Sequence, residues 1–178
     1  YGAITRANII NDPSSTNRKI ALYVVSQDNN GNLAETNMIT KENIKSWLNI
    51  YRSLNDQIEI FNPKIVNFDI SFTVSVDKKF SQQVVLRKCI EEIKILYADK
   101  LYIGEPVYLS RVYSILNRVD GVIDVRKVKF ENKSGGLYSN VTLDFDKILS
   151  KDATYYMTPL NCIMELKYPD LDIKGIVK

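Results

Sequence analysis

The clearest pattern in this chain is a strict alternation of apolar and polar residues between positions 65 and 77. Successive side chains of a strand point to opposite faces, so this stretch is predicted to be a strand with one buried and one solvated face. The apolar positions are Val66, Phe68, Ile70, Phe72, Val74 and Val76, and the polar positions are Asn67, Asp69, Ser71, Thr73 and Ser75.

Other stretches carry weaker strand patterns. Residues 18–26 are apolar on both faces, which is typical of a central strand. Between residues 122 and 130 the alternation changes phase, which predicts a β-bulge near Arg126–Lys127. The remaining strands are expected at 57–61, at 137–145 with Val141, Leu143 and Phe145 inward, and at 160–167.

Apolar residues at spacings of three and four predict three helices, over 41–54, over 82–98 and between Ser110 and Gly121. Thr40, Ser81 and Ser110 are the expected N-caps, because a hydroxyl can accept a hydrogen bond from a first-turn N–H. Gly121 follows the third helix, at a position where a left-handed residue commonly ends a helix. The apolar stripes are Ile44, Trp47, Leu48, Tyr51 and Leu54; Leu86, Cys89, Ile90, Ile93, Leu96 and Tyr97; and Val112, Ile115, Leu116 and Val119.

These elements predict an α+β fold, a ferredoxin-like split βαβ sandwich with an added C-terminal β-hairpin. We expect residues 1–17 to be a linker from a missing N-terminal part, since they are polar and rich in turn residues. Residues 18–133 would form the α+β core, and residues 134–178 a β extension and tail. The chain opens on Tyr1 rather than methionine, so we expect it to be a fragment of a longer protein.

The composition argues against an enzyme. The 178 residues include no histidine, which removes the commonest general base and imidazole metal ligand. Neighbouring carboxylates such as Asp144 and Asp146 are interpreted as a solvated polar face, because no further ligand type accompanies them. Neither a P-loop nor a dinucleotide-binding glycine motif is present. We therefore expect no catalytic or metal-binding residues, no cofactor and no small-molecule substrate.

Cysteine usage and hydropathy bear on disulfide bonding and on membrane association. Cys89 and Cys162 are interpreted as free and buried, because cysteine behaves as a small hydrophobe. A disulfide stays open as an alternative, since two cysteines alone do not establish a pairing. No apolar run approaches the roughly 20 residues that cross a bilayer, so no membrane partner is expected.

Basic residues around the predicted 122–130 strand raise a nucleic-acid alternative. They are Arg126, Lys127, Lys129 and Lys133. Acidic residues are interleaved with them, the net charge is only +3, and the aromatic RNA-binding signature of such sheets is absent. Nucleic acid is therefore not the favoured partner, although a nucleic-acid-binding ferredoxin-like module remains the alternative function.

Tyrosine and methionine residues outside the strand and helix patterns are the candidate interface residues. These residue types are enriched in the cores of protein interfaces. Ordinary core packing explains the same pattern equally well. The candidates are Tyr108, Tyr113, Tyr155, Tyr156 and Met157.

From about Ile20 to Val128 the chain resembles the baseplate J-like family of contractile-tailed phages. Within that family it is similar to the C-terminal part of the large baseplate wedge subunit of T-even-like phages. The resemblance lies in the order and spacing of packing and turn residues over roughly a hundred positions. The two stretches that carry it are WLNIYRSLNDQIEIFNPKIVNFDISFTVSV and YIGEPVYLSRVYSILNRVDGVIDV.

The resemblance implies a structural virion protein without catalysis. Wedge subunits of this family dimerise and join neighbouring wedges into a ring around the tail hub. The implied partners are therefore further copies of the chain and other baseplate wedge proteins. The implied location is the tail baseplate of the virion, with the host cytoplasm during assembly.

Overall fold

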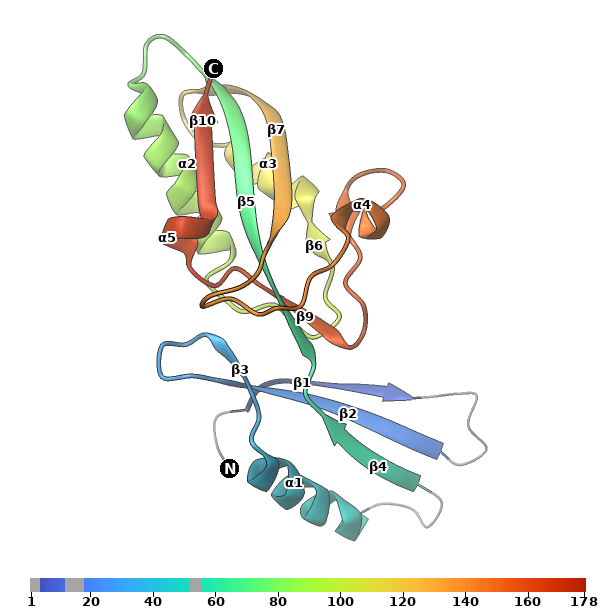
Figure 1. Ribbon diagram of the computed structural model, residues 1–178. Coiled ribbons are helices and arrows are strands. Elements are labelled where there is room, and N and C mark those ends of the chain that lie inside the picture. The colour runs from blue at the N-terminus through green and yellow to red at the C-terminus, as the bar shows by residue number, and fades with distance from the viewer. Residues whose placement is uncertain (1–3, 12–17, 52–55) are drawn as a thin grey trace. The chain divides into compact units, whose positions relative to one another are not determined.

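The computed structural model describes residues 4–11, 18–51 and 56–178, and it mixes helices with β-sheets (Figure 1). The chain forms two compact units. The N-terminal unit comprises the chain up to Ile65 with two later segments, Tyr102–Gly104 and Pro159–Ile163. The C-terminal unit comprises Val66–Leu101, Glu105–Thr158 and Met164–Lys178. These divisions differ from the boundaries predicted after residues 17 and 133.

The N-terminal unit is built on a four-stranded sheet and one helix. Its elements are β1 Ile4–Asn11, β2 Arg18–Gln27, β3 Leu33–Glu35, α1 Met38–Tyr51 and β4 Asp56–Phe61. Strand β2 pairs antiparallel with β1 and β3 and parallel with β4. The central position predicted for this strand from its two apolar faces is confirmed.

Strand β1 shows that the linker prediction for residues 1–17 is wrong over residues 4–11. Ala7 pairs with Val24 and Ile9 with Leu22 in a regular antiparallel ladder. The backbone groups of this stretch gain hydrogen-bond partners from β2, the next strand in the chain. Residues 12–17 lie outside the described part of the chain.

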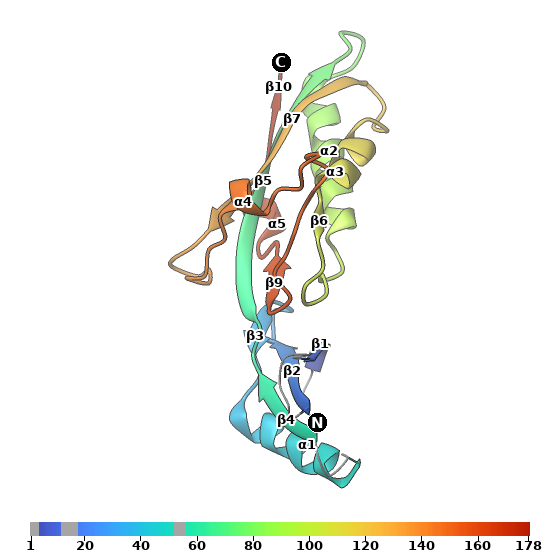
Figure 2. The same cartoon turned by 90° about the vertical axis from the view of Figure 1, so that its right-hand side faces the viewer.

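The C-terminal unit is built on a second four-stranded sheet, with two main helices. Its elements are β5 Lys64–Val76, α2 Gln82–Leu96, β6 Val107–Tyr108, α3 Leu109–Leu116, β7 Val122–Lys133, α4 Phe145–Ile148, β8 Tyr155–Tyr156, β9 Cys162–Glu165, α5 Pro169–Asp172 and β10 Ile173–Val177. Strands β5 and β9 each begin with two residues that belong to the N-terminal unit. Strand β5 runs parallel to β10 and antiparallel to β7, and β9 also pairs with it. Figure 2 shows α2 and α3 on the same side of this sheet.

The alternation in residues 65–77 is confirmed by the core beneath the two helices. Five of its six apolar side chains, from Val66 to Val74, are buried and pack with Phe130 of β7 and Cys89 of α2. The predicted bulge is also confirmed. Thr73 pairs with Lys127 and the next residue, Val74, pairs with Val125, so Arg126 is the extra residue.

The predicted helices form, but two of the three predicted caps are wrong. Helix α1 begins at Met38, and the Asn37 side chain accepts a hydrogen bond from the Thr40 N–H at 2.7 Å. Ser110 lies inside α3, which begins at Leu109. Ser81 does precede α2, without a side-chain capping bond. Gly121 has φ +95° as predicted, and a Cβ there would meet Phe80 and Val85 at 2.9 Å.

The strand predicted at 137–145, and with it the C-terminal hairpin, is wrong. Among the described residues this stretch is a loop that leads into α4. The Asn132 amide donates to the Leu143 carbonyl at 2.6 Å and accepts from the Leu143 N–H at 3.0 Å. The Asn132 side chain thus satisfies both backbone groups of Leu143, which a paired strand would otherwise do. Val141, Leu143 and Phe145 still pack against the core as predicted.

Candidate interaction site

The predicted interface residues all lie in the C-terminal unit, where β6 and β8 bring two of them together. Tyr108 pairs with Tyr155 across this two-stranded sheet, and their ring centroids lie 5.7 Å apart. The Arg111 guanidinium lies over the Tyr108 ring at 4.9 Å. Both tyrosines are half-buried, so they offer some of their surface to a partner.

The other three predicted residues differ in exposure. Tyr156 is buried against Phe130 and Phe145, and burial raises its pKa above the ordinary tyrosine value. The Tyr113 hydroxyl accepts a hydrogen bond from the Val128 N–H at 3.0 Å. Met157 is 58% exposed. Core packing therefore accounts for Tyr113 and Tyr156, whereas the Met157 side chain is open apolar surface.

A larger apolar surface lies on α1, in the N-terminal unit. The predicted stripe is wrong as a buried face, because Trp47 is 53% and Tyr51 70% exposed and no residue of α1 is fully buried. Ile44 and Leu48 are half-buried. Leu54 lies outside the described residues. The stripe is wider than one contact with a sheet can cover, since Ile39 and Ile50 extend it around the helix and are 70% and 73% exposed.

An apolar cavity of about 280 Å³ opens between α1 and the sheet of the same unit. It has no polar lining group, so it suits an apolar side chain rather than a charged ligand. The Trp47 indole forms one wall and is also part of the exposed surface of α1. The lining residues are Ile4, Ala7, Leu22, Val24, Ile44 and Trp47.

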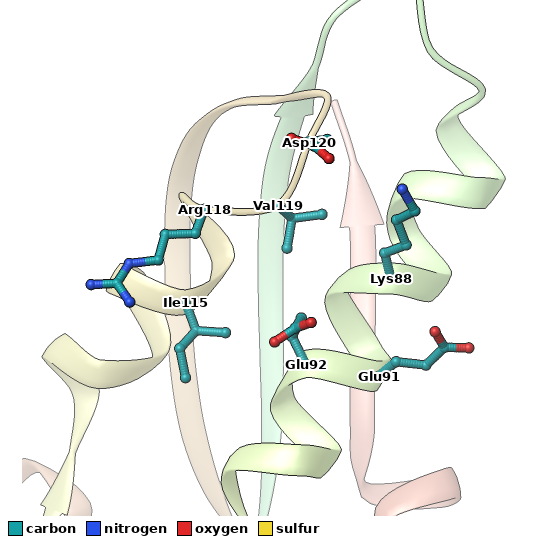
Figure 3. Close-up of a pocket in the computed structure, with 7 residues that line it drawn as sticks. All are labelled: Lys88, Glu91, Glu92, Ile115, Arg118, Val119 and Asp120. Atoms are coloured by element: carbon teal, nitrogen blue, oxygen red, sulfur yellow. The ribbon is translucent and has the colours of Figure 1, made fainter.

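A second hollow, of about 400 Å³, lies between α2 and α3 and is lined by both signs of charge. Figure 3 shows Arg118 and Glu91 on opposite sides of it, pointing away from one another. Glu91 is also 3.8 Å from Arg87 on its own helix. Two cations and three carboxylates around Ile115 and Val119 give this hollow no preference for ligands of one charge. Its lining residues are Lys88, Glu91, Glu92, Ile115, Arg118, Val119 and Asp120.

Buried polar groups in the C-terminal unit correct the prediction that the polar side of β5 is solvated throughout. Asn67 and Asp69 are buried on that side. The Asn67 amide donates to Glu165 at 2.9 Å and accepts from the Ser139 N–H at 2.8 Å. Lys100 lies 2.9 Å from the other Glu165 oxygen. These bonds attach the 134–144 loop and β9 to β5, so they hold the fold together.

The carboxylates also have structural partners. Asp144, predicted on a strand face with Asp146, precedes α4 instead and pairs with Lys147 at 3.0 Å, a contact that lowers the Asp144 pKa. Buried Asp172 accepts a hydrogen bond from the Tyr138 hydroxyl at 2.6 Å. Burial and this bond raise the pKa of Tyr138 to about 12. Among residues 4–11, 18–51 and 56–178, no three His, Cys, Asp or Glu side chains are grouped to hold a metal.

The cysteines are free and buried, as predicted. Burial raises the thiol pKa of both, that of Cys89 to about 11, so neither is activated as a nucleophile. In the described part of the chain no helix is both long and apolar enough to span a bilayer. Neither models of known protein families nor curated protein sequences yield a match to this chain.

Proposed function

We propose that this chain is a structural component of a phage tail baseplate wedge, which self-associates to join wedges into a ring around the tail hub. The resemblance of residues 20–128 to the baseplate J-like family supports the virion role, with assembly in the host cytoplasm. The observation that carries self-association is the exposed apolar surface of α1, where Ile39, Ile50 and Tyr51 are each at least 70% exposed. Such patches mark interaction sites.

A ferredoxin-like split βαβ relationship belongs to the same proposal. Two helices on one side of the β10–β5–β7 sheet support it, as does the parallel pairing of β2 with β4 around α1. In that arrangement the sheet and helices supply rigid packing, and surface side chains supply the contacts to other wedge proteins.

One observation favours the nucleic-acid alternative. Lys129 and Lys174 both lie beside Ser71 on the open side of the C-terminal sheet, and Lys127 lies beside Thr73. Glu131 pairs with Lys129 on this side, and Asp69 pairs with Lys133 at 3.5 Å. These ion pairs reduce the charge available to phosphate groups, so we place this function second.

Sedimentation velocity of the chain over a wide concentration range tests the proposal. We expect a dimer or larger species that persists in moderate salt, because apolar burial is not screened by ions. A strict monomer at the highest concentration would contradict self-association of this chain. Binding to mixed single- and double-stranded nucleic acid that weakens steeply with salt would favour the alternative instead.

A further inference from the structure

Three apolar side chains of α1 lie together on one flank of the helix. At about 100° per residue, Ile39, Trp47 and Ile50 fall within an arc of about 80°. They are 70%, 53% and 73% exposed, so the sheet of their own unit covers little of this flank. The Tyr51 ring packs on Trp47, with centroids 4.9 Å apart, and is 70% exposed.

The edge strand of the sheet adds a fifth apolar side chain. Ile9 pairs with Leu22, two residues along β1 from Ala7, so it shares a sheet face with Ala7 and Leu22. That is the face that lines the apolar cavity. Ile9 is 62% exposed. We call Ile9, Ile39, Trp47, Ile50 and Tyr51 the α1 surface.

The area of the α1 surface matches half of a dimer interface. With about 200 Å² for each fully exposed apolar side chain of this size, the five leave roughly 650 Å² open. The largest patch on a typical monomer is about 300–600 Å². A standard interface buries about 800 Å² on each partner, so two copies meeting through this surface come close to that size.

The α1 surface is also suited to pair with itself. A two-fold interface uses the same patch on both copies, so each patch must offer both a projection and a recess. Ile50 projects, and the 280 Å³ cavity beside Trp47 is the recess. Lys41 and Lys45 lie on the opposite flank of the helix, so apposition of two copies does not bring these charges together.

We infer that the α1 surface binds the same surface of a second copy of the chain, so that α1 packs against α1 of that copy across a two-fold axis. This inference rests on the proposed self-association and names the surface that carries it. Apolar burial around Trp47 would supply most of the affinity, since buried aromatic anchors dominate interface energetics.

The test compares two glutamate variants of the full chain by sedimentation velocity. Ile50→Glu places a charge in the α1 surface. Ile95→Glu is the matched control, because Ile95 is also the penultimate residue of its helix and is 68% exposed, but lies in the C-terminal unit. We expect Ile50→Glu to weaken dimerisation at least about tenfold, the effect of burying an unpaired charge, and Ile95→Glu to leave it unchanged.

Tryptophan fluorescence gives a second readout, because Trp47 is the chain's only tryptophan. Its emission should shift to shorter wavelength as the wild type dimerises and should not shift in Ile50→Glu. A dimer that Ile50→Glu and Ile95→Glu affect equally, with constant emission, would overturn the inference but leave self-association standing. A monomer at every concentration would overturn both. A blue shift with lipid vesicles alone would replace the second copy with a membrane surface.

Discussion

The two units use similar helices in different ways. Helices α1 and α2 both carry apolar residues at helical spacing, yet α2 buries Val85, Cys89 and Ile93 while α1 buries no residue. In the C-terminal unit, α3 and the 134–144 loop enlarge the core around β5. Among the described residues of the N-terminal unit, the buried cluster comprises Val25, Leu33, Ile103 and Ile163. An apolar stripe therefore indicates that one face of a helix is suited to burial, but it does not show whether another element of the same unit covers that face.

The largest expected difference in the free energy of unfolding is between alanine variants of one phenylalanine in each unit. Phe68 is fully buried and packs on Phe130 at 5.5 Å, whereas Phe61 is 40% exposed and packs on Tyr23 at 5.6 Å. We expect Phe68→Ala to lower the free energy of unfolding by about 3–5 kcal/mol, because it leaves a core cavity. Phe61→Ala should cost about 1–2 kcal/mol. Urea unfolding followed by circular dichroism measures both, and equal losses would contradict the difference in packing.

Alanine variants of two glycines, one in each unit, should differ less in stability. Gly121 has φ +95° and its added Cβ would lie 2.9 Å from Phe80 and Val85, while Gly31 has φ +79° and open space around it. Gly121→Ala combines backbone strain with overpacking and should cost about 2–3 kcal/mol. Gly31→Ala carries the strain alone, about 1 kcal/mol. Thermal unfolding of both variants checks the order, and a larger loss for Gly31→Ala would contradict it.

Each unit contains one buried cysteine, so thiol labelling compares their local stability. Cys162 belongs to the N-terminal unit and Cys89 to the C-terminal unit. Both thiols need local opening to react, and opening is easier where fewer side chains are buried. We expect native-state labelling of Cys162 to be at least about tenfold faster. Labelling in denaturant should equalise the rates, and faster labelling of native Cys89 would reverse the comparison.

The smallest expected effect concerns pH and only the C-terminal unit. Burial raises the pKa of Asp69 above 3.8, although Lys133 and Lys174 oppose the shift. The folded state then holds the Asp69 proton more tightly than the unfolded state does. Protonated Asp69 therefore adds to the free energy of unfolding in full below pH 3.8, and this added stability is lost as pH rises through the folded pKa. Asp69→Asn should remove this decline in the unfolding transition seen by circular dichroism.

Two controls sharpen the pH experiment. The fluorescence of Trp47 reports the N-terminal unit, and its unfolding transition should keep the same pH dependence in Asp69→Asn. Glu131→Gln changes an exposed carboxylate whose pKa Lys129 lowers, so it should not reproduce the effect. A steeper decline in Asp69→Asn than in the wild type would contradict the assigned sign.

Much of the secondary structure was predictable because its causes are local. Alternation predicted β5, a phase change predicted the bulge at Arg126, and Gly121 marked the turn into β7. The interface candidates were less predictable. Tyr156 and Met157 are adjacent, yet one is buried and the other is 58% exposed. Sequence spacing separates their faces but does not reveal which face meets another element.

The sequence by itself determined where most strands and helices lie, which of their faces are apolar, and that its cysteines favour burial. Tertiary structure alone decided that β1 pairs with β2, that Asn132 binds the 134–144 loop, and that α1 keeps Trp47 exposed. The physical reason is range. Periodicity and turn residues act over a few positions within one element, whereas backbone pairing and coverage of a helix depend on groups of other elements, which lie beyond that range.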